Sequence, residues 1–118
     1  MPTILLVEDD KLLRELVSAY LRSRECFVCE VGSAEEALAA QRSGRRFNFL
    51  VTDIDMPGCL DGWDLAERIT ATDGGVKVVY TTSGRGNPPR QIPGSVLLRK
   101  PYQPQQLMVA VVSMSESL

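Results

Sequence analysis

Hydrophobic positions follow two alternating patterns along the chain. Continuous apolar runs predict buried strands, and apolar residues spaced three and four apart predict amphipathic helices. The predicted strands are residues 3–8, 26–31, 47–52, 76–82 and 95–99. The predicted helices carry four apolar sets: Leu12, Leu13, Leu16, Val17, Tyr20 and Leu21; Ala34, Ala37, Leu38 and Ala39; Trp63, Leu65, Ala66 and Ile69; and Leu107, Met108, Val111 and Val112.

Capping and breaking residues mark where these helices begin and end. Asp10 precedes the first apolar set and is expected to be a helix N-cap. Ser33 followed by Glu36 indicates a capping box at the second helix, which should end near Gly44. The third helix should stop before the Gly-Gly pair at residues 74–75.

The C-terminal third departs from this regular alternation. Residues 84–95 contain three glycines and three prolines, which makes a regular helix of full length unfavourable there. Pro104 can occupy the first turn of the last helix, and residues 113–118 are expected to fray.

Alternating strands and helices with short links predict a parallel sheet with helices on both faces. We expect a single domain over residues 1–118, of the α/β flavodoxin-like class. Its doubly wound, five-stranded sheet should have the order 2-1-3-4-5. The fourth helix of this fold, between the fourth and fifth strands, should be short or irregular because it falls within residues 84–95.

Composition narrows the function. The chain has 118 residues and a net charge of -2, with no basic excess, so direct binding to DNA is not expected. Neither a signal peptide nor a membrane span is evident, which predicts a cytoplasmic protein. Cys26 and Cys29 should face opposite sides of a strand, and the chain has no histidine, so core packing is favoured over a zinc site.

Reactive side chains lie at the ends of four of the five predicted strands. Glu8 and Asp9 lie at the end of the first strand, Asp53 at the end of the third, Thr82 at the end of the fourth and Lys100 at the end of the fifth. Strands one and three are neighbours at the switch point of a 2-1-3-4-5 sheet, so their acids should meet in one crevice.

Crowded carboxylates favour a hard divalent cation, Mg²⁺ or Mn²⁺. A carboxylate beside that cation can accept a phosphoryl group. Lys100 and the Thr82 hydroxyl would then bind phosphoryl oxygens.

Four segments carry a resemblance to the receiver domain of two-component response regulators over nearly the whole chain. They are Val7-Glu8-Asp9-Asp10, Val51-Thr52-Asp53-Ile54-Asp55-Met56-Pro57 with Asp61-Gly62, Thr82-Ser83, and Lys100-Pro101-Tyr102.

The resemblance implies a role for each matching residue. Asp53 would be the phosphoacceptor, Glu8 and Asp9 the acidic pair, and Asp55 a metal ligand through its backbone carbonyl. Thr82 would be the switch hydroxyl. Lys100 would bind phosphate and precede a commonly cis peptide bond.

The resemblance also implies partners. A histidine kinase or histidine phosphotransfer protein would be the donor, and a downstream effector protein the target. Dimerisation would be possible.

The sequence departs from the family pattern in two places. Leu97 stands where receivers usually carry the aromatic residue of the switch, and the loop between Pro57 and Asp61 is one residue longer. The segment Tyr80-Thr81-Thr82-Ser83-Gly84 partly resembles an atypical receiver subgroup common in alphaproteobacteria.

Two alternative functions stay open. One is a constitutive interaction module that needs no phosphorylation. The other is a haloacid-dehalogenase-type phosphatase, whose D-x-D motif Asp53-Ile54-Asp55 resembles, although those enzymes place it after their first strand.

Without histidine the chain cannot be the phosphotransfer partner, and the short segment after the last helix leaves no room for a DNA-binding output. We therefore expect a signalling domain whose only reactions are its own phosphorylation and dephosphorylation.

Overall fold

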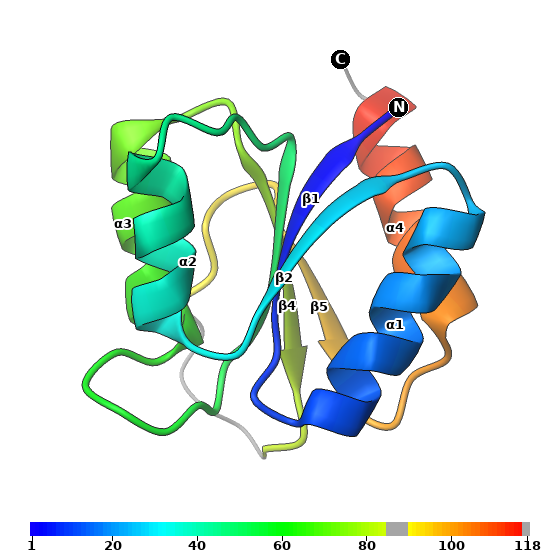
Figure 1. Ribbon diagram of the computed structural model, residues 1–118, viewed down its shortest axis with the longest axis horizontal. Helices are drawn as coiled ribbons and strands as arrows, with labels where there is room; N and C mark the ends of the chain where they lie inside the picture. The colour runs from blue at the N-terminus through cyan, green and yellow to red at the C-terminus, as the bar shows by residue number, and fades with distance from the viewer. Residues whose placement is uncertain (85–89, 117–118) are drawn as a thin grey trace.

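A computed structural model describes residues 1–84 and 90–116 (Figure 1). Within them the strands are β1 (Thr3–Val7), β2 (Phe27–Val31), β3 (Phe49–Asp53), β4 (Lys77–Thr82) and β5 (Val96–Arg99). The helices are α1 (Lys11–Ser23), α2 (Ala34–Arg42), α3 (Gly62–Thr72) and α4 (Pro104–Glu116). Each lies close to its predicted range.

The strands form one parallel sheet in the order β2-β1-β3-β4-β5, as predicted. Val7 of β1 is paired with Thr52 of β3, so Glu8 and Asp53 follow from neighbouring positions. On the other side, Asp53 pairs with Thr81 of β4. The register therefore brings the ends of the three central strands to one edge of the sheet.

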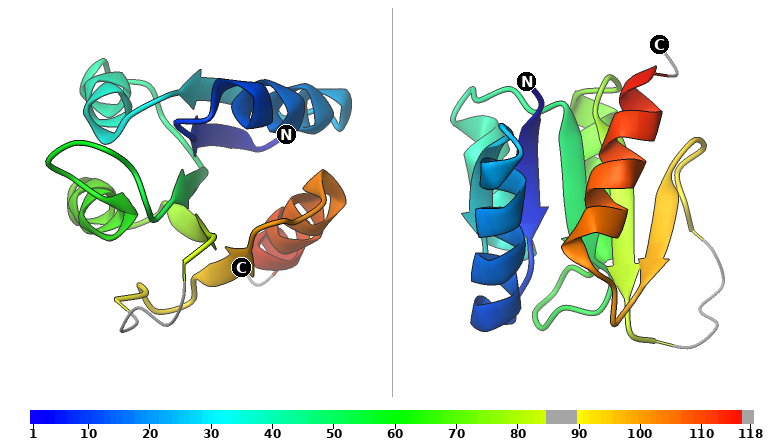
Figure 2. Two further views of the ribbon diagram at one scale, coloured as in Figure 1. Left: turned by 90° about the horizontal axis from the view of Figure 1, so that it is seen from below. Right: turned by 90° about the vertical axis from the view of Figure 1, so that its right-hand side faces the viewer.

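Helices cover both faces of the sheet, which explains why the central strands are apolar throughout. Helices α2 and α3 lie on one face and α1 and α4 on the other (Figures 1 and 2). All five residues of β3 are buried. Two core clusters result, one under α2 and α3 around Leu50 and Tyr80, the other under α1 and α4 around Val51 and Leu107.

The predicted helix caps are largely confirmed. The Asp10 side chain accepts a hydrogen bond from the Leu13 amide and is the N-cap of α1. The Ser33 hydroxyl accepts from the Glu36 amide, as in a capping box. The Glu36 carboxylate, however, accepts from the Gly32 amide rather than from Ser33, so the box is shifted by one residue on that side.

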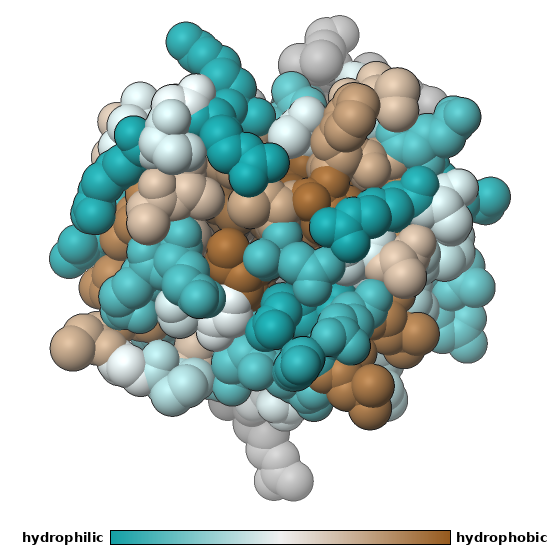
Figure 3. Space-filling model, viewed as in Figure 1, coloured by the Kyte–Doolittle hydropathy of each residue, from teal (hydrophilic) through white to brown (hydrophobic). Residues whose placement is uncertain are grey.

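Helix α1 is rotated relative to the face that its apolar pattern suggests. Val17 and Leu21 are buried as expected, but Leu12 and Leu16 are exposed. Apolar patches interrupt the mostly polar surface near the start of α1, at the lower right of Figure 3. The rotation turns a polar residue, Arg14, inward, with a side chain only 18% exposed.

The segment before β5 agrees with the prediction made from the sequence, and the end of the last helix does not. The described part of residues 84–95, namely residues 84 and 90–95, contains no helix, and residues 85–89 lie outside the described residues. The predicted fraying from Ser113 is wrong as far as Glu116, because α4 continues there and buries Met114 against the core. Residues 117–118 lie outside the described residues.

The cysteines behave as predicted from strand geometry. Cys26 belongs to the core cluster under α1 and α4, whereas Cys29 packs against the cluster on the other face. Both are free thiols, as is Cys59. Among the described residues, no helix has the length and apolar character needed to cross a membrane.

Candidate functional site

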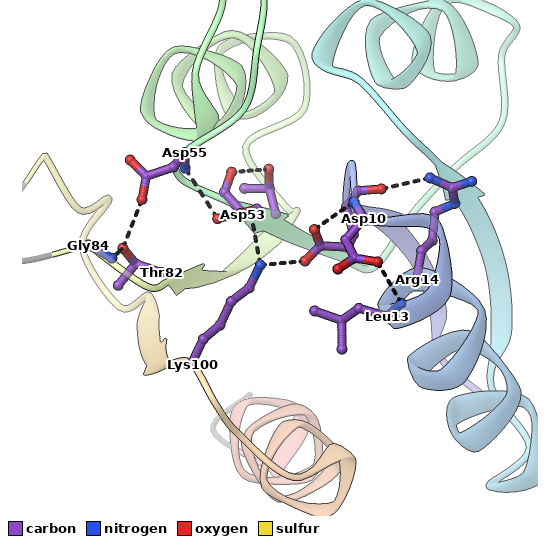
Figure 4. Close-up of polar contacts among 10 residues, drawn as sticks. Asp10, Leu13, Arg14, Asp53, Asp55, Thr82, Gly84 and Lys100 are labelled. Carbon is purple, nitrogen blue, oxygen red and sulfur yellow. Dashed lines mark hydrogen bonds and ion pairs between the residues drawn. The ribbon is translucent and has the colours of Figure 1, made fainter.

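Three strands deliver charged side chains to the same edge of the sheet. The Lys100 ammonium donates hydrogen bonds to Glu8 Oε1 at 2.7 Å and to Asp53 Oδ2 at 2.9 Å (Figure 4). These residues are up to 92 positions apart in the chain, and the topology alone brings them together. The predicted convergence of Glu8, Asp53 and Lys100 is thus present in the structure.

Carboxylate oxygens of Glu8, Asp9 and Asp53 all lie within 4.8 Å of one another. Glu8 and Asp53 are buried, and Asp9 is exposed at the mouth of the cluster. This oxygen-only donor set, with one side open to water, fits a hard divalent cation such as Mg²⁺, which keeps several of its waters.

Burial dominates the electrostatics of the two inner acids. Burial raises the pKa of both Glu8 and Asp53, and the hydrogen bonds from Lys100 offset only part of this effect. For Lys100, burial alone would lower the pKa, but the hydrogen bonds to Glu8 and Asp53 and the negative charges of these two acids together outweigh burial and raise it. Lys100 therefore stays charged and serves as a fixed cation between two partly desolvated carboxylates.

Thr82 lies at the other end of the site. Its hydroxyl donates to Asp55 Oδ2 at 3.3 Å and accepts from the Gly84 amide at 2.9 Å (Figure 4). The Asp55 amide in turn donates to Asp53 Oδ1 at 3.2 Å. Thr82 is thus connected to Asp53 through Asp55, and its hydroxyl is held by the side chain of that residue.

A close backbone approach explains the glycine after the acidic loop. A Cβ atom on Gly62 would lie 2.2 Å from the backbone oxygen of Asp53, which no side chain tolerates. The Gly62 amide also donates to the Ile54 carbonyl at 2.9 Å. Asp61 and Asp64 form a complete capping box at the start of α3.

Leu97 has an aromatic neighbour on the adjacent strand. It is paired in register with Tyr80, which is fully buried. The Tyr80 ring packs against Trp63, with ring centroids 4.6 Å apart, and its hydroxyl accepts from the Ile92 amide. An aromatic side chain therefore lies on β4, in register with Leu97 of β5.

Sequence reasoning missed two contacts at this site. The Arg14 guanidinium donates to the backbone carbonyl of Glu8 at 2.8 Å. The Asp55 side chain was not expected to accept from Thr82. An arginine one turn after the N-cap of the first helix was the available signal for the first contact.

Comparisons with known proteins agree with this geometry. Residues 4–112 match the family model described as the response regulator receiver domain. Protein PetR of Rhodobacter capsulatus is 32% identical over 117 residues, covering 93% of this chain and 47% of that protein. Transcriptional regulatory protein AfsQ1 of Streptomyces coelicolor is 34% identical over 73 residues, covering 62% of this chain and 32% of that protein. The chain spans less than half the length of either relative.

A solved structure has the same fold. The response regulator receiver protein of Sinorhizobium medicae has a TM-score of 0.86 and 29% sequence identity, over 96% of this chain and 93% of that one. The chain therefore belongs to the response regulator receiver domains, a family of signalling domains that interact with histidine kinases and effector proteins.

Proposed function

We propose that this chain accepts a phosphoryl group on Asp53 from a histidine kinase or a histidine phosphotransfer protein. The observation that carries the proposal is the position of the Asp53 carboxylate. It lies against the Lys100 ammonium and within the cluster of Glu8 and Asp9. A carboxylate held beside a fixed cation in a partly desolvated pocket is suited to phosphoryl transfer, which depends on positioned charge.

The transfer is a displacement at phosphorus. A carboxylate oxygen of Asp53 forms the new P–O bond as the P–N bond of the donor phosphohistidine breaks, and the electron pair of that bond returns to the imidazole. Lys100 remains protonated and binds one phosphoryl oxygen as a compact charge. The Thr82 hydroxyl leaves Asp55 and donates to another.

Glu8, Asp9, Asp53 and the backbone carbonyl of Asp55 would hold Mg²⁺ or Mn²⁺. When bound, the cation supplies charge that offsets the negative phosphoryl oxygens. Glu8 also accepts a hydrogen bond from Lys100 and so helps to hold the ammonium beside Asp53 before the donor arrives.

Phosphorylation would then act as a switch. The modification carries about -1.5 to -2 charges where the carboxylate carried one. A nearly complete shift between two conformations requires about 5.5 kcal/mol of differential stabilisation. New charge-assisted contacts from Thr82 and Lys100 are the source of that energy, and an effector protein would bind the altered surface. A cytoplasmic location, one domain over residues 1–118 and the capacity to dimerise stay predictions.

The phosphatase alternative is not favoured by any contact in the site. Asp53 and Asp55 lie on and after β3, in the middle of the sheet, rather than after the first strand. A constitutive interaction module would instead bind its partner equally well with and without phosphorylation.

The test is labelling by a small phosphodonor. Wild-type protein incubated with acetyl phosphate and Mg²⁺ should gain one alkali-labile, hydroxylamine-sensitive phosphoryl group, and chelation of the metal should prevent it. Asp53→Asn should not be labelled, and Asp64→Asn, which changes an acid outside the site, should be labelled like wild type. Equal labelling of Asp53→Asn would contradict the proposal, as would a wild-type protein that no phosphodonor or kinase modifies.

A further inference from the structure

Arg14 contacts the backbone of the acidic cluster that Glu8, Asp9 and Asp53 form. It lies on the first turn of α1, and its Nη1 donates to the backbone carbonyl oxygen of Glu8 at 2.8 Å (Figure 4). This carbonyl belongs to the peptide unit that joins Glu8 to Asp9, the two acids at the end of β1. The guanidinium therefore acts on the backbone between the two acidic residues.

The Arg14 side chain is itself held in place. Its Nε lies 3.7 Å from Glu30 Oε1 on the neighbouring strand, and Glu30 also pairs with Arg22 at 3.1 Å. Gly32 provides the space, because a Cβ atom there would lie 3.0 Å from Arg14 Nη1. Glu8 after β1 and the segment from Glu30 to Gly32 thus surround one guanidinium.

The remaining bonds of Glu8 show what Arg14 adds. The Glu8 amide donates to the Val31 carbonyl, and its carboxylate accepts from the Asp10 amide and from Lys100. These contacts hold the residue on its N-terminal side and at its side-chain end. The bond from Arg14 holds the C-terminal side, and so fixes the plane of the peptide that orients Asp9.

A cation near a metal site has two opposing effects. Its charge repels the metal, and its hydrogen bond orders the ligands. Here Glu30 lies close to Arg14 and offsets much of its charge, so the repulsion is small. Ordering of the ligand backbone should therefore dominate, as it does for outer partners of metal ligands in general.

We propose that Arg14 is a positioning residue that raises the affinity of the acidic cluster for a divalent cation by fixing the Glu8–Asp9 peptide. This inference rests on the proposed function, since it concerns the same metal site. It assigns to Arg14 no contact with the metal or the phosphoryl group.

Calorimetric titration of the full chain with Mg²⁺ tests it. Arg14→Gln should weaken Mg²⁺ binding by about tenfold, the lower end of the effect of such outer partners. Arg22→Gln is the matched control: Arg22 pairs with the same Glu30 and donates to the Val28 carbonyl, away from Glu8, so the Mg²⁺ affinity should stay within about twofold of wild type.

A second variant keeps the arginine and displaces it. Gly32→Ala places a methyl group against Arg14 Nη1 and should weaken Mg²⁺ binding by a smaller factor, with shifted amide resonances of residues 8–10 in NMR spectra. A purely structural role would lower the melting temperature of Arg14→Gln and leave both the affinity and these resonances unchanged. This variant also decides the question if Arg14→Gln does not fold.

The outcomes separate this inference from the proposed function. If wild type binds Mg²⁺ and is phosphorylated while Arg14→Gln and Gly32→Ala bind Mg²⁺ with wild-type affinity, the role of Arg14 is overturned and the proposed function stands. If wild type binds no divalent cation, both are overturned. A loss of affinity in both variants, with Arg22→Gln unchanged, supports the role of Arg14.

Discussion

Two clusters in this chain have the same make-up, one cation between two carboxylates, and differ in burial. Lys100 lies 2.7 and 2.9 Å from Glu8 and Asp53, and these side chains are 18%, 5% and 6% exposed. Arg90 lies 3.0 and 2.7 Å from Asp64 and Glu67, with 42%, 34% and 49% exposed. The closest N···O distances are similar, whereas the burial of the two clusters differs.

The acids of the buried cluster and Asp64 of the exposed cluster have pKa shifts in opposite directions. The pKa of Asp64 is lowered, mainly by its hydrogen bond from Arg90, because the group stays hydrated. The pKa values of Glu8 and Asp53 are raised despite Lys100, because burial outweighs the cation. The exposed cluster attaches the segment before β5 to α3, whereas the buried one is the site that the proposed function assigns to a cation and a phosphoryl group.

Removing the central cation of the buried cluster should have the largest effect on the free energy of unfolding. Lys100→Met leaves the buried Glu8 and Asp53 without their cationic partner, so in metal-free buffer the free energy of unfolding should fall by about 3 kcal/mol. Urea denaturation in the presence of a chelator measures it. Lys11→Met, which removes an exposed lysine paired with Glu15, should leave stability unchanged within error. A Lys100→Met protein as stable as wild type would show that the buried charges are relieved in another way.

Magnesium should stabilise the buried cluster and not the exposed one. At a free concentration ten times its dissociation constant, a ligand that binds only the folded state adds about 1.4 kcal/mol. Wild type and Arg90→Gln should both gain this amount in urea denaturation. Asp9→Asn, which lacks the exposed acid of the cluster, should gain much less. An equal gain for Asp9→Asn would place Mg²⁺ elsewhere.

Removing Arg90 should have a smaller effect than removing Lys100. Arg90→Gln breaks two exposed ion pairs that water and salt already screen. The loss of stability should therefore be a small fraction of that in Lys100→Met. It should also shrink as the salt concentration is raised towards 1 M, where the screening length is about 3 Å. A loss as large as that of Lys100→Met would mean that burial does not separate the clusters.

Lowering the pH should reduce the difference in free energy of unfolding between Arg90→Gln and wild type. Because the pKa of Asp64 is lower in the folded state, its pairing with Arg90 stabilises the fold above the ordinary pKa of aspartate. That contribution disappears as the pH falls through the lowered folded-state pKa. Denaturation of both proteins over an acid series measures the trend, and a difference that grows towards low pH would contradict it.

The strand ends could be predicted because short apolar runs and the residues after them suffice to define them. Asp53, Glu8 and Lys100 each follow a run of this kind, and the sheet order implied by alternating elements places their ends together. No contact between side chains had to be known in advance.

The rotation of α1 could not be predicted in the same way. Its six apolar positions span more of the helix surface than the sheet can cover, so the sequence does not say which of them face outward. Leu12 and Leu16 proved to be exposed and Arg14 inward. The contact from Thr82 to Asp55 was missed because the side-chain direction after Asp53 depends on the path of the loop to Gly62.

Locating the phosphoryl group tests the central claim most directly. After reaction with acetyl phosphate and Mg²⁺, reduction of the acyl phosphate with borohydride converts the modified aspartate to homoserine, which peptide mass spectrometry can place. Homoserine is expected at position 53, with unmodified side chains at Glu8, Asp9 and Asp55. Modification at one of those acids, with Asp53 intact, would contradict it.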